Sequence, residues 1–275
     1  MNIIESTLHI GVKTPFTVVH ISDTHLTYAD LRDGERKVEL AKGRKTCFPY
    51  DEEAVLLLAS DTAKEKGAPI VHTGDLIDFV SLANLERARQ FVTENDCFLA
   101  AGNHEFSLYV GEAKEDAAYR NQSLALVQEA FPNDIRMAAR MIGGVNFVAL
   151  DNGYYLFEEA QLAFLKNEVE KGAPVILLMH TPLYEPALYD IQMQKAPCAY
   201  LVDVPEEKMR SYPRDRYEQQ LSDVVTKEMV AYIKAEPRIK AILTGHLHAN
   251  YEGMVDGHLP QIMTACDDVR VIEID

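Results

Sequence analysis

Five short groups of polar residues follow apolar runs that are typical of buried strands. They are Ser22-Asp23-Thr24-His25, Gly74-Asp75, Gly102-Asn103-His104-Glu105, Met179-His180-Thr181 and Gly245-His246-Leu247-His248. Their Asp, Asn and His side chains are able to bind hard or borderline metal ions. In open sheets with crossover connections, ligands bind beyond the carboxyl ends of the strands, where residues distant in sequence converge. We therefore expect these groups to build one shared site.

Seven of these side chains are candidate metal ligands, namely Asp23, His25, Asp75, Asn103, His180, His246 and His248. Carboxylate oxygen and imidazole nitrogen, without thiolate, suit Mn, Fe, Zn or a similar divalent ion. Seven side chains exceed the four ligands of one tetrahedral zinc. A pair of ions about 3.5–4 Å apart that share a carboxylate accommodates them, and such pairs promote in-line displacement at phosphorus. The set therefore predicts two divalent metal ions: Mn, Fe, Zn or a mixed pair.

Taken in order, the motifs resemble those of the calcineurin-like metallophosphoesterase superfamily, and the pattern is closest to bacterial cyclic-nucleotide-type phosphodiesterases. The resemblance spans residues 23–248 and rests on Asp23-x-His25, Gly74-Asp75, Gly102-Asn103-His104-Glu105, His180 and Gly245-His246-x-His248. It implies that one ion is held by Asp23, His25 and His248 and the other by Asn103, His180 and His246. Asp75 would bridge the two ions, and a hydroxide between them would be the nucleophile.

The same resemblance assigns a proton donor. His104 matches the family histidine that protonates the leaving oxygen and stabilises the phosphoryl oxygens, so His104 and Asn103 are both expected to contact the substrate. Asp78, in Gly-Asp-Leu-Ile-Asp, resembles the carboxylate that orients this histidine in some members. Glu105 is the alternative for that orienting role.

Apolar runs rich in Val, Ile and Phe alternate with helical patterns, which is typical of layered α and β structure. The patterns predict helices over residues 51–67, 81–94 and 158–170. Strands are expected over residues 16–21, 69–73, 97–101, 145–150, 175–179 and 239–243. The resemblance implies an α+β fold, a four-layer αββα sandwich of two mixed sheets with the metals at one end. Short strands within residues 251–275 would complete the second sheet.

Two long stretches interrupt this alternation, and we expect them to be insertions, at about 27–50 and 183–216, in a single metallophosphoesterase domain spanning residues 1–275. The first contains a basic cluster that is either a solvated loop or a surface close to an anionic substrate, made of Lys42, Arg44 and Lys45. The second contains speculative phosphate-binding residues of a lid, with a solvated surface as the alternative: Arg210, Arg214 and Arg216.

The formal net charge of −16 argues against a nucleic-acid surface, because binding a polyanion depends on clustered Lys and Arg. Metal ions in the site would offset this charge locally for a phosphorylated substrate. No basic segment followed by an apolar stretch opens the chain, and no run approaches the roughly 20 apolar residues of a membrane span. The expected location is therefore cytoplasmic, without membrane association.

These features predict a metal-dependent phosphoester hydrolase acting on a small phosphodiester or phosphomonoester such as a nucleotide. A protein serine/threonine phosphatase is an alternative, but the chain lacks the Asp-Arg-Gly continuation that those enzymes carry after Gly-Asp. A non-catalytic metal-binding scaffold of the same fold is another, although such scaffolds are expected to have lost ligands. Amide hydrolysis at a dinuclear site is the third.

Overall fold

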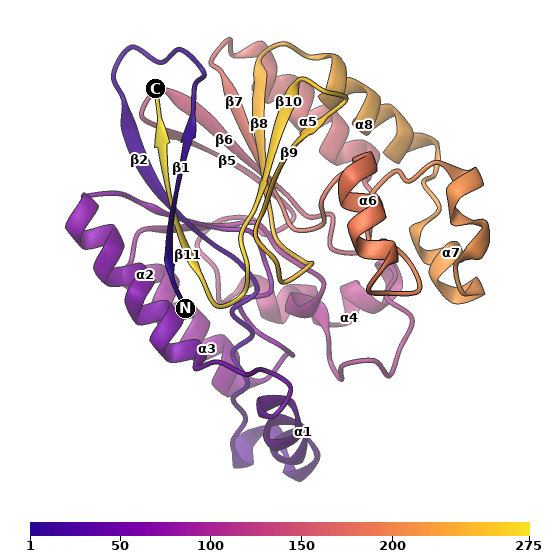
Figure 1. Ribbon diagram of the computed structural model, residues 1–275. Helices are drawn as coiled ribbons and strands as arrows, with labels where there is room; N and C mark the ends of the chain where they lie inside the picture. The colour runs from indigo at the N-terminus through magenta and orange to yellow at the C-terminus, as the bar shows by residue number, and fades with distance from the viewer.

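The computed structural model describes residues 1–275, and its strands form two mixed sheets (Figure 1). The first sheet has the strand order β1-β11-β2-β3-β4, and the second has the order β5-β6-β7-β8-β10-β9. The strands are β1 (Ile3–Leu8), β2 (Phe16–Ile21), β3 (Ile70–His72), β4 (Cys97–Leu99), β5 (Met137–Ile142), β6 (Val145–Leu150), β7 (Val175–Met179), β8 (Ile239–Thr244), β9 (Tyr251–Val255), β10 (Leu259–Met263) and β11 (Val269–Ile274).

Eight α-helices surround the sheets, and three short 3-10 turns lie in the connections. The helices are α1 (Glu35–Lys45), α2 (Glu52–Lys66), α3 (Leu82–Glu94), α4 (Ala117–Gln128), α5 (Glu159–Glu170), α6 (Pro186–Met193), α7 (Arg214–Gln220) and α8 (Val224–Ala235). The 3-10 turns are η1 (Leu31–Asp33), η2 (His104–Phe106) and η3 (Glu206–Ser211). None of the helices is long and apolar enough to cross a membrane.

Three apolar layers hold this arrangement together. The middle layer lies between the sheets and includes Val18 of the first sheet and Phe147 and Leu243 of the second. The outer face of the first sheet packs on α2 and α3, and that of the second sheet packs on α5 and α8. Burying both faces of a sheet requires such covering helices. The expected four-layer αββα sandwich is therefore confirmed.

The expected strands and helices are present, with ends that differ by a few residues. The helix at 51–67 begins as its sequence predicts, because Asp51 accepts the backbone N–H groups of Glu53 and Ala54. It ends at Gly67 in the left-handed conformation (φ 59°). The prediction that the C-terminal strands complete the second sheet is wrong for β11. That strand lies in the first sheet, parallel to β1 and antiparallel to β2.

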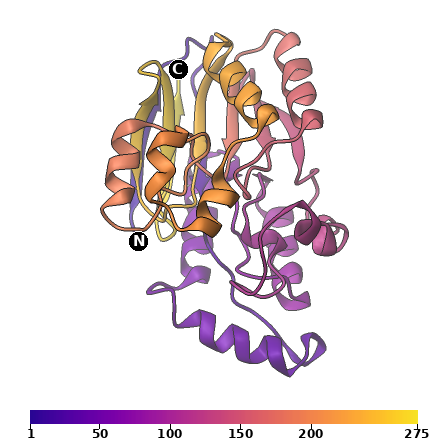
Figure 2. The ribbon, with the colours of Figure 1, turned by 90° about the vertical axis from the view of Figure 1, so that its right-hand side faces the viewer.

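Both long stretches contain helices. Residues 27–50 include η1 and α1, and α1 lies beyond the ends of the sheets in Figure 1. Residues 183–216 include α6, η3 and the start of α7, which pack through Leu188 and Met209 on Met263 of β10. Figure 2 shows α6 and α7 next to each other in front of the yellow C-terminal strands. These helices therefore lie near the carboxyl ends of the second sheet's strands.

Candidate metal centre

The seven candidate ligands lie in the loops that directly follow five strands. Strands β2, β3 and β4 are parallel neighbours in one sheet, and β7 and β8 are parallel neighbours in the other. Their carboxyl ends therefore meet at one end of the sandwich. The structure brings six of them together, in the loops after β2 (Asp23, His25), β3 (Asp75), β7 (His180) and β8 (His246, His248). Asn103 follows β4 and directly precedes His104, whose backbone N–H binds Asp75.

One group of potential ligand atoms consists of Asp23, His25 and His248, all within 4.8 Å of one another. His248 Nε2 lies 3.4 Å from Asp23 Oδ1 and 3.0 Å from His25 Nε2. Asp23 and His25 are buried, whereas the side chain of His248 is 41% exposed. This group therefore opens to solvent on the His248 side.

A second group consists of Asp75, His180 and His246. His180 Nε2 lies 3.1 Å from both Asp75 Oδ2 and His246 Nδ1. Asp75 Oδ2 is also 3.9 Å from His25 Nε2 of the first group. The other oxygen, Oδ1, accepts the backbone N–H of His104 at 2.8 Å. Asp75 Oδ2 thus faces both groups. Asp23 Oδ1 also faces both, at 3.9 Å from His180 Nε2 and 3.9 Å from His25 Nε2, so Asp75 is distinguished by its shorter distance to His180.

The surroundings of the Asn103 side chain indicate whether this arrangement suits a metal ion. Its Oδ1 atom is buried and accepts no hydrogen bond, whereas its Nδ2 atom lies 3.4 Å from Glu115 Oε1. A buried carbonyl oxygen without a partner is costly unless another group binds it. The potential ligand groups are carboxylate, amide and imidazole, without thiolate, and divalent ions such as Mn, Fe or Zn bind such groups. The residues therefore fit a metal centre.

Five of the seven candidates have left-handed backbone conformations. Their φ angles are 54° for Asp23, 53° for His25, 57° for Asp75, 70° for His246 and 49° for His248. Non-glycine residues in this region are uncommon and concentrate at functional sites. Tight packing accompanies this geometry, because a Cβ atom on Gly245 would lie 1.8 Å from Ser22 Oγ. Glycine is thus required directly before His246.

Groups outside the ligand set fix the orientation of two histidine rings. His180 Nδ1 lies 2.7 Å from the carbonyl oxygen of Thr73, so Nδ1 carries the proton and Nε2 faces Asp75. The Tyr155 hydroxyl lies 3.0 Å from His246 Nε2 and leaves Nδ1 directed at His180. Such partners orient ligands and raise their affinity for metal. Neither Thr73 nor Tyr155 belongs to a motif, and no sequence signal marks them.

The pKa values of the ligand candidates reflect the concentration of carboxylates and imidazoles in the centre. Burial opposes ionisation of Asp23, but the nearby histidines, His180 first, hold its pKa well below the usual value. Burial likewise disfavours charged imidazole, yet Asp75 and Asp23 raise the pKa of His180 to about 9. Hydrogen bonding to Asp23 raises the pKa of His248 to about 11, also against burial. Burial and the neighbouring His180 lower the pKa of His246 to about 3.

His104 and Asp78 form a pair beside the first group. His104 Nδ1 lies 2.7 Å from the backbone carbonyl of Asp78 and 3.1 Å from its carboxylate oxygen Oδ1. Burial opposes the charged imidazole, but Asp75 and Asp78 raise the pKa of His104 to about 10. Asp78 Oδ1 is also 3.2 Å from His25 Nδ1. Protonated His104, with Nδ1 held by Asp78, is therefore the form expected at neutral pH.

Glu105 lies elsewhere, although its sequence position made it the alternative partner of His104. Its carboxylate is fully buried and accepts the backbone N–H groups of Gly102, Asp75 and Leu76, each at 2.7 Å. Glu105 thus fixes the backbone of two ligand loops. Asp78 rather than Glu105 contacts the His104 ring.

The stretch 27–50 reaches the centre through three side chains that follow each other closely. Arg44 donates from Nε and Nη2 to the Asp78 carboxylate at 2.6 and 2.9 Å. The Phe48 ring stacks on His25 with a centroid distance of 4.7 Å. The Tyr50 hydroxyl donates to the backbone carbonyl of Asp23 at 3.0 Å. Arg44 therefore differs from Lys42 and Lys45, which pair with glutamates away from the centre.

Of the three arginines expected in the lid, one is placed near the centre. Arg214 is 92% exposed and pairs with Glu218 on its own helix. Arg210 is also exposed. Arg216 is partly buried, and its guanidinium group lies 5.6 Å from the centre of the Tyr200 ring. That ring in turn lies 6.1 Å from His246.

The chain is similar to known proteins in its sequence pattern and in its fold. The model of the calcineurin-like phosphoesterase family matches residues 16–250. No curated protein matches the sequence. Among solved structures, a dimetal phosphatase from Danio rerio shares 16% identity at a TM-score of 0.51, covering 91% of this chain and 87% of its own. This likeness supports the fold.

Two further solved structures are less similar. A putative 5′-nucleotidase from Staphylococcus aureus shares 12% identity at a TM-score of 0.46, covering 92% of this chain and 49% of its own. This chain thus spans about half of that protein. The phosphopantetheinyl hydrolase from Mycobacterium tuberculosis shares 12% identity at a TM-score of 0.44, covering 90% of this chain and 89% of its own.

Proposed function

Because the chain belongs to the calcineurin-like phosphoesterase family and is thus a metallophosphoesterase, we propose that it hydrolyses a small phosphodiester or phosphomonoester at a binuclear metal centre. In this proposal Asp23, His25 and His248 hold one divalent ion. Asn103, His180 and His246 hold the other, and Asp75 bridges the two. The observation that carries the proposal is the position of Asp75 Oδ2, 3.1 Å from His180 Nε2 and 3.9 Å from His25 Nε2.

Two bound divalent ions would supply positive charge that neutralises the phosphate and lowers the pKa of water, so that hydroxide acts as the nucleophile near neutral pH. The protein's own part is to fix the ligands before the substrate arrives. The left-handed loops support such preorganisation, as do the hydrogen bonds of His180 to the Thr73 carbonyl and of His246 with the Tyr155 hydroxyl.

His104 is proposed to protonate the leaving oxygen. Its raised pKa, about 10, keeps it protonated at neutral pH, and the Asp78 carbonyl and carboxylate engage Nδ1. Nε2 is then the atom available for the substrate. Asp78 acts by positioning His104, and Arg44 acts by holding the Asp78 carboxylate. General acid catalysis of this kind is typically worth 10²–10⁴-fold in rate.

A small substrate such as a nucleotide is favoured over a phosphoprotein. The residues that follow Gly74-Asp75 are Leu76-Ile77-Asp78, so the Asp-Arg-Gly continuation of the protein phosphatases is missing. In addition, α6, η3 and α7 lie beside the second sheet near the centre. These helices would restrict the approach of a folded protein substrate.

An activity panel tests the proposal. Purified protein is assayed with an aryl phosphomonoester, an aryl phosphodiester, cyclic nucleotides and nucleotides, with Mn²⁺, Fe²⁺, Zn²⁺ and Mg²⁺ in parallel. Metal content per chain is measured on the same samples, together with Asp75→Asn and the control Asp61→Asn, an exposed residue of α2. We expect turnover that is lost in Asp75→Asn and retained in Asp61→Asn. Two bound metals without turnover on any ester would instead favour the non-catalytic scaffold.

A further inference from the structure

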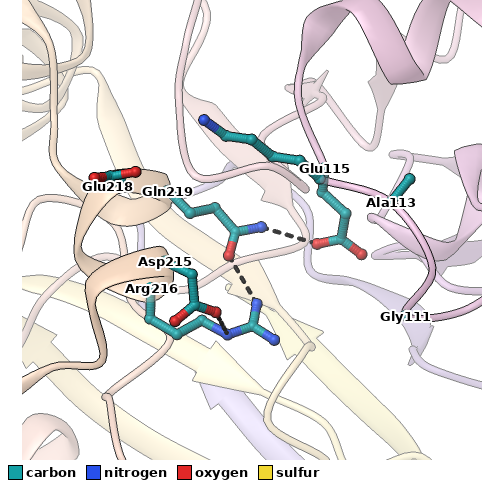
Figure 3. A pocket seen from close by; sticks show the side chains of 8 residues that line it. Gly111, Ala113, Glu115, Asp215, Arg216, Glu218 and Gln219 are labelled. Carbon is teal, nitrogen blue, oxygen red and sulfur yellow. Dashed lines mark hydrogen bonds and ion pairs between the residues drawn. The ribbon is translucent and has the colours of Figure 1, made fainter.

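A cleft lies beside the candidate metal centre, between α7 and the segment of residues 111–117 that precedes and begins α4 (Figure 3). It contains a cavity of about 290 Å³. The Gln219 amide nitrogen donates to Glu115 Oε2 at 3.0 Å, and its oxygen accepts from Arg216 at 2.8 Å, as Figure 3 shows. These side chains thus bind one another, and the groups that hold the ligand loops lie deeper in the fold.

Two fully buried histidines contact the ligand loops without belonging to the ligand set. They are His20 of β2 and His72 of β3, and each stands three positions before a candidate ligand, Asp23 or Asp75. A buried imidazole needs partners for both ring nitrogens, because an unpaired polar atom inside a protein is costly. The partners of those nitrogens therefore indicate what each ring holds together.

His72 connects the loop after β2 with the loop after β3. Its Nδ1 atom lies 3.1 Å from the backbone nitrogen of Gly74, which can only donate, so Nδ1 carries no proton. Burial lowers the pKa of His72 to about 3, so the ring is neutral at pH 7 and its proton is on Nε2. Nε2 donates to the Thr24 hydroxyl at 2.9 Å. Thr24 stands between two ligands of the first group, and Gly74 directly precedes Asp75.

His20 connects the loop after β3 with the end of β10. Arg270 donates from Nε to the Thr264 hydroxyl oxygen at 3.1 Å, and this hydroxyl lies 2.8 Å from His20 Nδ1. Because Arg can only donate, the hydroxyl hydrogen of Thr264 is left for Nδ1. Burial and the charge of Arg270 hold the pKa of His20 well below its usual value, which keeps the ring neutral. Nε2 then carries the proton and donates to the Thr73 hydroxyl at 2.9 Å.

Thr73 passes this contact on to a candidate ligand. Its backbone carbonyl accepts the Nδ1 proton of His180 at 2.7 Å, while its hydroxyl accepts from His20. Partners of this kind orient metal ligands. His20 therefore fixes the residue that orients His180.

The loops that His72 joins are under backbone strain. The three candidate ligands next to Thr24 and Gly74 have left-handed φ angles of 54°, 53° and 57°. Such conformations persist only where surrounding contacts hold them. An apolar side chain at position 72 would avoid the cost of enclosing polar nitrogens, but it could not bond to either loop. The imidazole therefore fixes the direction of the loops, which packing alone does not.

We propose that His20 and His72 are positioning residues of the metal centre, and that each ring, with its proton on Nε2, holds a ligand loop in the geometry that a metal ion requires. They act through the hydroxyl groups of Thr73 and Thr24 and the backbone of Gly74. The assignment rests on the proposed metal centre and adds residues that determine its affinity for metal.

Substitutions at the two hydroxyl partners test the proposal. Thr24→Val and Thr73→Val remove the group that accepts from each histidine and keep a similar shape, whereas Thr24→Ser and Thr73→Ser keep the hydroxyl. Ser60→Ala is the matched control, because it removes a buried hydroxyl of α2 that donates to the Leu56 carbonyl. The affinity of metal-stripped protein for Zn²⁺ is measured by competition with a chromophoric chelator, and the Tm is measured on the same samples.

The expected effect is on metal affinity. Outer partners of metal ligands typically contribute about 10–100-fold, and these histidines act one residue further away, so we expect affinity for Zn²⁺ to fall about tenfold in each valine variant. The serine variants and Ser60→Ala should bind Zn²⁺ as the wild type does, although Ser60→Ala should also lower the Tm. Unchanged affinity in a valine variant would overturn the role of the histidine that it tests. A fall of equal size in the serine variants or in Ser60→Ala would overturn the positioning role altogether.

Hydrogen exchange in the metal-stripped protein provides a second readout. The Gly74 N–H donates to His72 Nδ1, so its exchange reports whether the two loops are held together. Since loss of one hydrogen bond changes a local equilibrium by about tenfold, we expect exchange at Gly74 to become about tenfold faster in Thr24→Val and to stay unchanged in Thr24→Ser. Equal exchange in Thr24→Val and the wild type would contradict the proposal. If the wild type binds no Zn²⁺, the proposed metal centre fails, while hydrogen exchange still decides whether His72 holds the loops.

Discussion

Replacing Arg44 tests how the proposed proton donor, His104, is held in position. The arginine reaches the Asp78 carboxylate with two hydrogen bonds, and Asp78 in turn contacts His104 Nδ1. Replacing Arg44 by Gln removes the cation but keeps a polar side chain of similar reach. We expect this change to loosen Asp78 and, through it, His104, without removing a metal-ligand candidate.

The expected loss of stability follows from the burial of the two side chains. The Asp78 side chain is fully buried, while that of Arg44 is 23% exposed. A hydrogen bond to a charged group contributes about 1.5–3 kcal/mol, and the exposure of Arg44 places its loss toward the lower end. Two histidines remain beside Asp78 to share its charge. We therefore expect unfolding to become about 1–2 kcal/mol easier, which lowers the Tm by roughly 2–8 °C for a chain of this size.

The kinetic effect should depend on the leaving group. A nitrophenyl ester departs as a stable anion and has little need of a proton, whereas an alkyl ester requires one. Since general acid catalysis supplies about 10²–10⁴-fold, a misplaced His104 should cost about tenfold or more on the alkyl ester and much less on the nitrophenyl ester. Lys42→Gln on the same helix, whose ion pair with Glu39 is exposed, should leave both rates unchanged.

The assay measures kcat/KM for both esters, the Tm and the metal content of each variant. An Arg44→Gln protein with wild-type rates on both esters would refute the argument that Arg44 positions His104. Equal losses on both esters together with loss of metal would instead assign Arg44 to the integrity of the metal centre.

Three further predictions concern the centre itself. Asp75→Ala should abolish turnover and lower the bound metal per chain, as measured by elemental analysis, because both groups of ligands lose their shared carboxylate. Normal turnover with a full complement of metal would contradict the bridging role of Asp75. Removing the ring in His104→Gln should keep the metal but slow hydrolysis of alkyl esters by about 10²–10⁴-fold in single-turnover assays, and an unchanged rate would exclude the acid role. Metal binding at pH 7 should release protons, on the order of two. The reason is that His180 and His248, with pKa values raised to about 9 and 11, are protonated in the metal-free protein. Calorimetry in buffers of different ionisation enthalpy measures the number of protons released, and the affinity for metal should weaken as the pH falls.

Local patterns predicted the strands that carry the site. Apolar runs such as residues 175–179 end in polar residues, and these ends lie where parallel strands of both sheets finish. The residue types at the ends, carboxylate and imidazole, indicated metal chemistry. The pattern was readable because a strand and the loop after it occupy consecutive positions in the chain.

Other features depend on contacts between distant segments. Arg44 lies 34 positions from Asp78, and Tyr155 lies 91 positions from His246. No periodicity marks either pair. The choice between Asp78 and Glu105 as the partner of His104 likewise required coordinates. Glu105 is adjacent to His104 in sequence but its carboxylate points to backbone N–H groups, whereas Asp78 lies 26 positions away and contacts the ring.

The sequence by itself determined the family's ligand types, their order and the strand ends that carry them, because these depend on local hydrophobic patterning and on the chemistry of single side chains. Only the tertiary structure decided that β11 pairs with β1 and β2, that the Asp78 carboxylate accepts hydrogen bonds from Arg44, and that α7 forms a cleft with the segment before α4. These outcomes are set by packing and hydrogen bonding between segments far apart in the chain, which no local window of residues encodes.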